Sequence, residues 1–267
     1  MQLFDATRQF VRQHFGRINK NLGAVPGGPK PKALSTYQTT PLPPAPVKWQ
    51  PFRRLHWGEY GNAGYGDCVY AAAAHCWMAL SRLLHQKFAV TGKMAIDAYK
   101  VYMAKYDNGQ DAGAVPSVVL QDWHTQGMWG ANLPAWAPID HTNLDEVRQT
   151  IHSYGCLMVC VQLPKPAWTY QLGSNYIRFK RPIWRLTGTA DDNVIVGYHE
   201  VAAVGYDKQF IYCISWGMLV RVTHSWWNRY VTETSALVVP AVVTAGGFNG
   251  LDFSSLEADL ATLPATH

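Results

Sequence analysis

Charged residues are scarce in this sequence. Asp, Glu, Lys and Arg make up 15% of its 267 residues, whereas a typical soluble domain has about 25%. The net charge is only +5, and the basic residues are scattered, with clusters only at 17–32 and 178–185. This pattern is too thin for a nucleic-acid footprint, so we expect no nucleic-acid partner.

Long hydrophobic runs are also missing. The longest apolar stretch, 231–243, is interrupted by Thr232, Glu233 and Pro240 and is too short to span a membrane. The first twenty residues lack the apolar core and cleavage site of a secretory signal. The five cysteines are an odd number without a spaced framework, which favours reduced thiols. We therefore expect no membrane association, no signal peptide and an intracellular protein.

Motifs for nucleotides and metals are absent as well. No glycine-rich loop is followed by a Lys-Ser or Lys-Thr pair. Cys156 and Cys160 share one face of a strand-like run, but no second Cys or His pair with suitable spacing follows. Asp191 and Asp192 lie in a turn with too few oxygen ligands nearby for calcium. We expect no cofactor and no metal ion.

Aromatic side chains and, near the beginning of the chain, prolines are abundant. The eleven Trp and fourteen Tyr fit either a large aromatic core or a surface that contacts other proteins. Residues 1–22 have the apolar spacing of a short amphipathic helix. The Pro- and Gly-rich residues 23–51 leave little room for helix or sheet, which predicts an extended arm. This arm (residues 1–51) either wraps its own domain or is held by a partner.

The rest of the chain divides into a helical half and a β half. Apolar periodicity predicts helices over 69–84, 95–105, 117–126 and 144–153, with Gly127 and Gly155 as stops. From Cys156 onward, runs rich in Val, Ile and Tyr predict strands over 157–163, 194–206, 210–215, 218–223 and 236–243. The pattern indicates an α+β domain over residues 52–245, with helices packed on an antiparallel sheet or barrel. A tail with a short helix follows over 246–267.

The segment Gly64-Tyr65-Gly66-Asp67-Cys68 directly before the first long helix is the main chemical signal. A thiol at a helix amino terminus is expected to have a lowered pKa, because the unpaired N–H groups there favour the thiolate. Such a nucleophile needs a histidine, and His199 opens the apolar strand 199–206. The alternatives are that Cys68 is a buried small side chain, and that His75, two helical turns further on, competes as the base. Packing is the preferred role for His75.

These residues resemble the papain-like cysteine peptidases. The resemblance lies in Cys68 before an Ala-rich helix, in His199-Glu200-Val201-Ala202-Ala203-Val204-Gly205-Tyr206, and in Ser215-Trp216-Gly217, and it covers about residues 58 to 240. It implies a papain-like fold in which Cys68 is the nucleophile and His199 the general base. Asn62 falls where the family has a glutamine whose amide helps form the oxyanion hole.

The third catalytic position departs from this family. Anchored on Ser215-Trp216-Gly217, the orienting asparagine of the family falls on Ile214, which cannot accept a hydrogen bond from the imidazole. A shift of one residue would place Ser215 there, and its hydroxyl is the best available substitute. Asp67 either opposes ionisation of the thiol or caps the helix.

Two hypotheses for the function follow. The first is a cysteine hydrolase that cleaves peptide or isopeptide bonds of a polypeptide substrate through Cys68 and His199. The second is a catalytically inactive papain-fold module that contacts neighbouring protein subunits through residues 1–51. A looser resemblance of the Gly66-Asp67-Cys68 block and of the tail 247–260 to papain-like proteins of tailed bacteriophages favours a virion or the host cytoplasm as its location.

Overall fold

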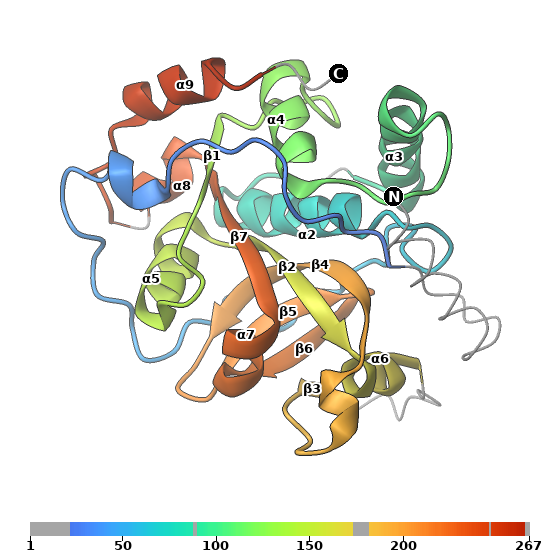
Figure 1. Ribbon diagram of the computed structural model, residues 1–267. Helices are drawn as coiled ribbons and strands as arrows, with labels where there is room; N and C mark the ends of the chain where they lie inside the picture. Colours follow the sequence, from blue (N-terminus) through green and yellow to red (C-terminus); the bar gives the residue numbers. More distant parts are fainter. Residues whose placement is uncertain (1–21, 88–89, 173–181, 246, 265–267) are drawn as a thin grey trace.

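Helices and strands are segregated along the chain, as the sequence predicts. The computed structural model describes residues 22–87, 90–172, 182–245 and 247–264. Its first half contains the helices α2 (Cys68–Leu83), α3 (Gly92–Tyr106), α4 (Pro116–Gln126) and α5 (Leu144–Tyr154). Of these, α2 lies against β4 (Ile195–Tyr206) and β2 (Leu157–Pro164) of a sheet, and α3 packs on α2 (Figure 1). The predicted α+β class with a helical half packed on a β half is confirmed.

The sheet has seven strands and is mostly antiparallel. Its strands are β1 (Ala135–Pro138), β2 (Leu157–Pro164), β3 (Ile183–Trp184), β4 (Ile195–Tyr206), β5 (Phe210–Ser215), β6 (Met218–Thr223) and β7 (Val231–Val238). Their order is β1-β7-β2-β4-β5-β6-β3, and the short β3–β6 pair is parallel. The central strands β2 and β4 are buried on both faces over most of their length, which explains their almost continuous apolar sequences.

Short elements outside the long apolar runs were not predicted. The helices α6 (Lys165–Leu172), α7 (His224–Tyr230) and α8 (Pro240–Ala245) have too few turns for a clear period. The predicted strand over 236–243 is wrong in its second half, because β7 ends at Val238 and Pro240 begins α8. Proline has no N–H for a sheet ladder but fits the first turn of a helix. The tail contains the expected helix as α9 (Phe253–Ala261), and the helix expected over residues 1–22 lies almost wholly outside the described residues.

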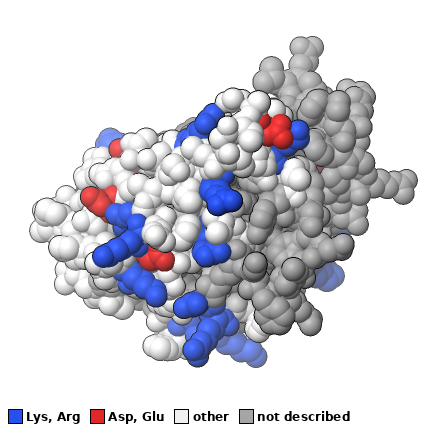
Figure 2. Space-filling view, turned by 90° about the horizontal axis from the view of Figure 1, so that it is seen from below, with Lys and Arg blue, Asp and Glu red and all other residues white. Residues whose placement is uncertain are grey.

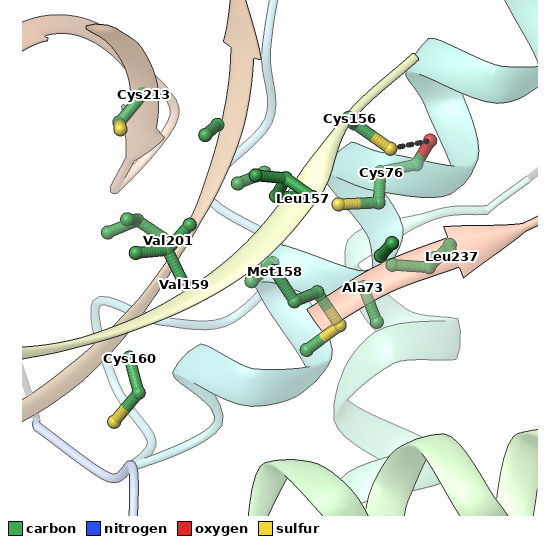
Figure 3. Packing of buried hydrophobic residues seen from close by; sticks show 14 of the residues in the cluster. Ala73, Cys76, Cys156, Leu157, Met158, Val159, Cys160, Val201, Cys213 and Leu237 are labelled. Atoms are coloured by element: carbon green, nitrogen blue, oxygen red, sulfur yellow. Dashed lines mark hydrogen bonds between the residues drawn. The ribbon is translucent and has the colours of Figure 1, made fainter. Parts of the chain in front are cut away.

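The aromatic residues belong to the core. Six tryptophans are fully buried: Trp123, Trp136, Trp168, Trp184, Trp226 and Trp227. Leaving Tyr170 aside, no Trp, Tyr or Phe in the described ranges is exposed, so an aromatic contact surface is not found among these residues. Figure 3 shows how α2 packs on β2, with Ala73 and Met158 on the helix side and Val159 and Val201 on the other side of the strand. The many aromatics therefore serve packing.

The arm wraps its own domain. Its described part is mostly extended, with one short 3₁₀ helix, η1 (Leu34–Tyr37), whose Leu34 and Tyr37 are buried. The segment runs from the amino end of α2 across the helical layer, then passes α5 and reaches the sheet (Figure 1). There Trp49 pairs with Tyr206 through two backbone hydrogen bonds of 3.0 and 2.9 Å.

The surface carries more basic than acidic side chains on the face seen from below in Figure 2, in several separate groups. None of the helices in the described ranges is long and apolar enough to cross a membrane.

Candidate active site

Cys68 is the first residue of α2, at the point where this helix meets β4. Its side chain is fully buried, with an exposed fraction of 0%. The sulfur lies beside the backbone of Glu200, the residue after His199, and beside the backbone of Gly23 in the arm. The fold therefore brings the predicted nucleophile next to the predicted histidine strand, as tertiary structure must do for a Cys–His pair.

The thiol of Cys68 is not activated in this closed arrangement. Burial raises its pKa above the ordinary value, and the nearby Glu200 and Asp67 carboxyls add to this. The backbone of Glu200 and of Gly23 acts in the opposite direction but does not compensate. The expected lowering by the helix terminus is therefore wrong for the closed state, because desolvation of a thiolate outweighs a partial charge at the end of a helix.

His199 lies on β4 and is held from two sides. Its Nε2 is 3.0 Å from Oγ of Ser215, and its ring stacks on Trp216 with 4.0 Å between centroids and 10° between planes. The histidine is fully buried. When Nε2 donates to the serine hydroxyl, the lone pair of the imidazole is on Nδ1, which is the state that a general base requires.

The structure resolves which residue faces His199. Ser215 ends β5 and contacts the imidazole, whereas Ile214 is buried in the sheet opposite Ala202. Side chains alternate along a strand, so Ile214 and Ser215 point to opposite faces of β5. Ser215 therefore holds the place beside His199 that the family's motif would give to Ile214. Trp216 and Gly217 form a two-residue hairpin turn with φ of 46° and 72°, which brings the indole over the imidazole.

Asn62 lies in the turn before α2 and is also buried. Its carbonyl oxygen accepts a hydrogen bond of 3.2 Å from Nε1 of Trp216, so the turn is fixed to the residue that stacks on His199. The Asn62 side chain lies beside Asp67 and lowers the pKa of that carboxyl. The structure thus brings His199, Ser215 and the Asn62 backbone together around Trp216, while Cys68 lies against the backbone of Glu200, the next residue on β4.

Asp67 occupies the N-cap position of α2 without capping the helix through its side chain. Its carboxyl is buried, which raises its pKa to about 8, and the neighbouring Asp111 adds to this. At neutral pH the group is therefore mostly protonated. A protonated carboxyl opposes ionisation of Cys68 less than a carboxylate would.

The arm covers the Cys68 thiol at Gly23. A Cβ on Gly23 would lie 1.8 Å from the carbonyl oxygen of Gly66, so only glycine fits at this contact. Gly23 accepts a hydrogen bond of 2.6 Å from the N–H of Ala114, and the N–H of Val25 donates to the carbonyl of Ala114 at 2.9 Å. The chain entering the site is thus held on both sides and covers Cys68.

The loop that holds the arm is itself fixed to the start of α2. Asp111 accepts hydrogen bonds from the N–H of Gly66 at 3.0 Å and from the Tyr99 hydroxyl at 2.7 Å. The same hydroxyl accepts from the N–H of Gly113 at 2.9 Å. Asp111 therefore couples the arm, its supporting loop and the turn before Cys68 into one hydrogen-bonded unit.

The competing residues have structural roles. Nε2 of His75 is 2.7 Å from the Gly58 carbonyl, and its ring packs against Trp57 and Tyr60, so burial lowers its pKa to about 4. The other four cysteines, Cys76, Cys156, Cys160 and Cys213, are buried and free (Figure 3). No group of three potential ligands in the described part of the chain can hold a metal ion.

The main feature that the sequence analysis missed is Glu200. It is 3% exposed and lies on β4 directly after His199, close enough to Cys68 to raise its pKa. The sequence did contain a signal, namely a charged residue inside an apolar strand. A charged residue is rarely buried without a partner, so its position pointed to a specific role. The contribution of Gly23 was also missed, because it depends on a contact between segments far apart in the sequence.

Comparison with solved structures identifies the architecture. Xylellain, a cysteine protease from Xylella fastidiosa, superposes with a TM-score of 0.59 at 13% identity, covering 83% of this chain and 97% of that one. The fold is papain-like. Digestive procathepsin L 3 of Tenebrio molitor larval midgut gives a TM-score of 0.54 at 10% identity, covering 87% of this chain and 79% of that one.

A third structure, the cysteine protease and lectin-like domains of Cwp84 from Clostridium difficile, gives a TM-score of 0.55 at 11% identity. It covers 86% of this chain and 58% of that one. No family model and no curated protein sequence matches the chain. At these identities the papain-like likeness concerns the fold, and the resemblance to bacteriophage proteins stays a prediction.

Asp67→Asn is expected to stabilise the protein more at pH 7.5 than at pH 4.5. An unfolded aspartate ionises near pH 4, whereas the folded Asp67 ionises near pH 8. Between these values the unfolded state loses a proton that the folded state keeps, so the wild-type free energy of unfolding falls as the pH rises, by at most about 1.4 kcal/mol per pH unit. Asparagine removes this dependence. Urea unfolding of both proteins at the two pH values measures the difference.

The matched control is Asp252→Asn. Asp252 caps α9 by accepting from the N–H of Ser255, and hydrogen bonds from Ser255 lower its pKa, so its contribution has the opposite sign. Its replacement is expected to cost stability above pH 4. An Asp67→Asn gain that is the same at both pH values would contradict the buried, protonated carboxyl.

Proposed function

We propose that this chain is a papain-fold cysteine hydrolase of peptide or isopeptide bonds, held closed by its own arm. The observation that carries the proposal is the position of the His199 imidazole. It lies between the Ser215 hydroxyl and the Trp216 ring, on the strand whose next backbone unit touches the Cys68 sulfur. A structural histidine has no need of this combination of an orienting hydroxyl and an aromatic cover.

The chemistry assigns one role to each residue. The Cys68 thiol gives its proton to His199, and the thiolate attacks the carbonyl carbon of the substrate. The backbone N–H of Cys68 and the side chain of Asn62 stabilise the oxyanion. His199 then protonates the leaving amine, which leaves an acyl group on Cys68. Water attacks this thioester, its proton passes through His199 back to the sulfur, and the acid product departs. Ser215 acts as a positioning residue for His199.

The closed arm supports a latent form of this enzyme. Cys68 cannot meet a substrate while Gly23 lies on Gly66, because the sulfur is completely buried. Over residues 23–30, which cover Cys68, the polar contacts of the arm are a few hydrogen bonds and the Lys30–Glu233 ion pair, each of which contributes about 1 kcal/mol. Local opening of such a segment requires much less free energy than unfolding of the domain.

A second function is favoured by the burial of Cys68 itself. A thiol that is fully covered and has a raised pKa also fits a papain-fold module that has kept its shape as a structural or adaptor part of an assembly, such as a bacteriophage particle. In that case neighbouring subunits would contact residues 1–51.

The test uses the full chain carrying Gly23→Ala, in which the arm cannot seat as before. We expect p-nitrophenyl acetate to acetylate Cys68 and to be turned over, and a panel of peptide and lysine isopeptide substrates to be cleaved. Cys68→Ala in the same chain should abolish both reactions. If Cys68 becomes accessible to alkylation while no acyl group is transferred, the hydrolase is excluded and the inactive module is the better account.

A further inference from the structure

A buried acidic row crosses the sheet next to Cys68. Cys160 on β2 lies directly opposite Glu200 on β4 and Glu233 on β7, so the three side chains share one face of the sheet. Figure 3 shows Cys160 on the opposite side of β2 from Val159 and Val201. The backbone of Glu200 lies against the Cys68 sulfur, which places this row beside the thiol.

Glu200 is the unusual member of the row. It is 3% exposed, and its Oε2 is buried without a hydrogen-bond partner among the described residues. A buried carboxyl oxygen without a partner costs free energy. Burial raises the pKa of Glu200, and Glu233 adds to this, while Cys160 and Lys30 act in the opposite direction. The unpartnered Oε2 can accept a hydrogen bond from a further cationic group.

The arm already supplies one cation at this row. Nζ of Lys30 is 2.8 Å from Oε1 of Glu233, and the N–H of Gly27 donates to the same oxygen at 2.9 Å. The Gly27 carbonyl in turn accepts from the hydroxyl of Ser117 at 2.9 Å. The arm thus runs as an extended peptide from Gly23 at the thiol to Lys30 at the acidic row, with its backbone hydrogen-bonded along the way.

We propose that Glu233 and Glu200 form an acceptor for the cationic side chain of a polypeptide substrate, lysine or arginine, which Lys30 occupies in the closed form. The substrate part of this proposal rests on the proposed hydrolase function. The ion pair is reachable from solvent, because the side chains of Lys30 and Glu233 are 28% and 20% exposed. A substrate that displaces the arm meets the same backbone partners and the same carboxyls.

The first test fills the space that Lys30→Ala leaves. The probe is n-butylammonium, which carries the same charged group on a four-carbon chain and needs no movement of the arm. We expect it to raise the melting temperature of Lys30→Ala saturably relative to sodium chloride at equal ionic strength, and n-butanol to have no such effect. In Lys30→Ala/Glu233→Gln the half-saturating concentration should rise at least about tenfold, because a charged hydrogen bond is lost.

The matched control is Lys32→Ala. Lys32 belongs to the same arm and has its own ion pair of 3.0 Å with Asp259, but its side chain is 66% exposed and lies outside the acidic row. This variant should not respond to butylammonium. An equal response of both variants, or a response that survives Glu233→Gln, would overturn the acceptor.

The second test separates the acceptor from the proposed function. In Gly23→Ala, peptides with lysine at each position near the cleaved bond are compared with norleucine analogues. We expect one lysine position to increase cleavage at least about tenfold, and Glu233→Gln or Glu200→Gln to remove that preference. Butylammonium binding without any cleavage would retain the acceptor and overturn the hydrolase. Cleavage without a lysine preference would retain the hydrolase and overturn the substrate assignment.

Discussion

Gly23→Ala is expected to make Cys68 react with iodoacetamide at least about 100 times faster than in the wild-type chain. The added Cβ would lie 1.8 Å from the Gly66 carbonyl oxygen, so the arm must leave its position. Losing the two backbone hydrogen bonds to Ala114 and the steric fit corresponds to about 3 kcal/mol, which is roughly a 100-fold change in the open population. Mass spectrometry of the alkylated peptides identifies the cysteine and gives its rate.

The control for this prediction is Gly64→Ala, in the turn before α2 that contains Gly66. A Cβ at Gly64 has its nearest neighbour at 3.9 Å, so the arm should stay in place and Cys68 should stay protected. Cys76, Cys156 and Cys213 are at most 1% exposed and report on unfolding, because they would be labelled only if the core opened. Equal protection of Cys68 in Gly23→Ala and in the wild type would show that the arm does not close the site.

His199→Ala in the Gly23→Ala chain is expected to lower the turnover of p-nitrophenyl acetate and peptides by about 10²–10⁴-fold. This range is the usual contribution of a positioned general base. Ser215→Ala should have a smaller effect and should shift the pH profile of kcat/KM, because the serine acts on the imidazole and not on the substrate. Steady-state rates across pH 5 to 9 measure both.

The control histidine is His56, which is exposed in the segment before α2. His56→Ala should leave the rates unchanged. If His199→Ala kept the activity of its parent, another group would have to serve as the base, and the stacking of His199 on Trp216 would be a packing feature alone.

The helices and strands that carry the site residues could be predicted from the sequence. The long apolar periodicity predicted α2, and β5 and β6 appear with the expected bounds, because their apolar patterns are strong and local. The resemblance to papain-like peptidases placed Cys68 and His199 on elements that the fold brings together. Short elements such as α6 were missed, since a helix of two turns has little periodicity.

The orienting residue could not be decided from the sequence. The choice between Ile214 and Ser215 depends on which of them faces β4 before the tight turn at Trp216 and Gly217, and a one-residue slip exchanges the two faces. The closure by Gly23 and the row of Cys160, Glu200 and Glu233 depend on tertiary contacts and strand register in the same way. These are the features on which the latency and the cation acceptor depend.

The pH dependence of Cys68 alkylation in Gly23→Ala, with and without His199→Ala, tests the central claim most directly. In the opened site a thiol paired with His199 should react half-maximally below pH 7, as paired cysteines do. Loss of the histidine should move this midpoint towards about 8.5, the value of an ordinary thiol. A midpoint that is the same in both proteins would contradict a functional pair of Cys68 and His199.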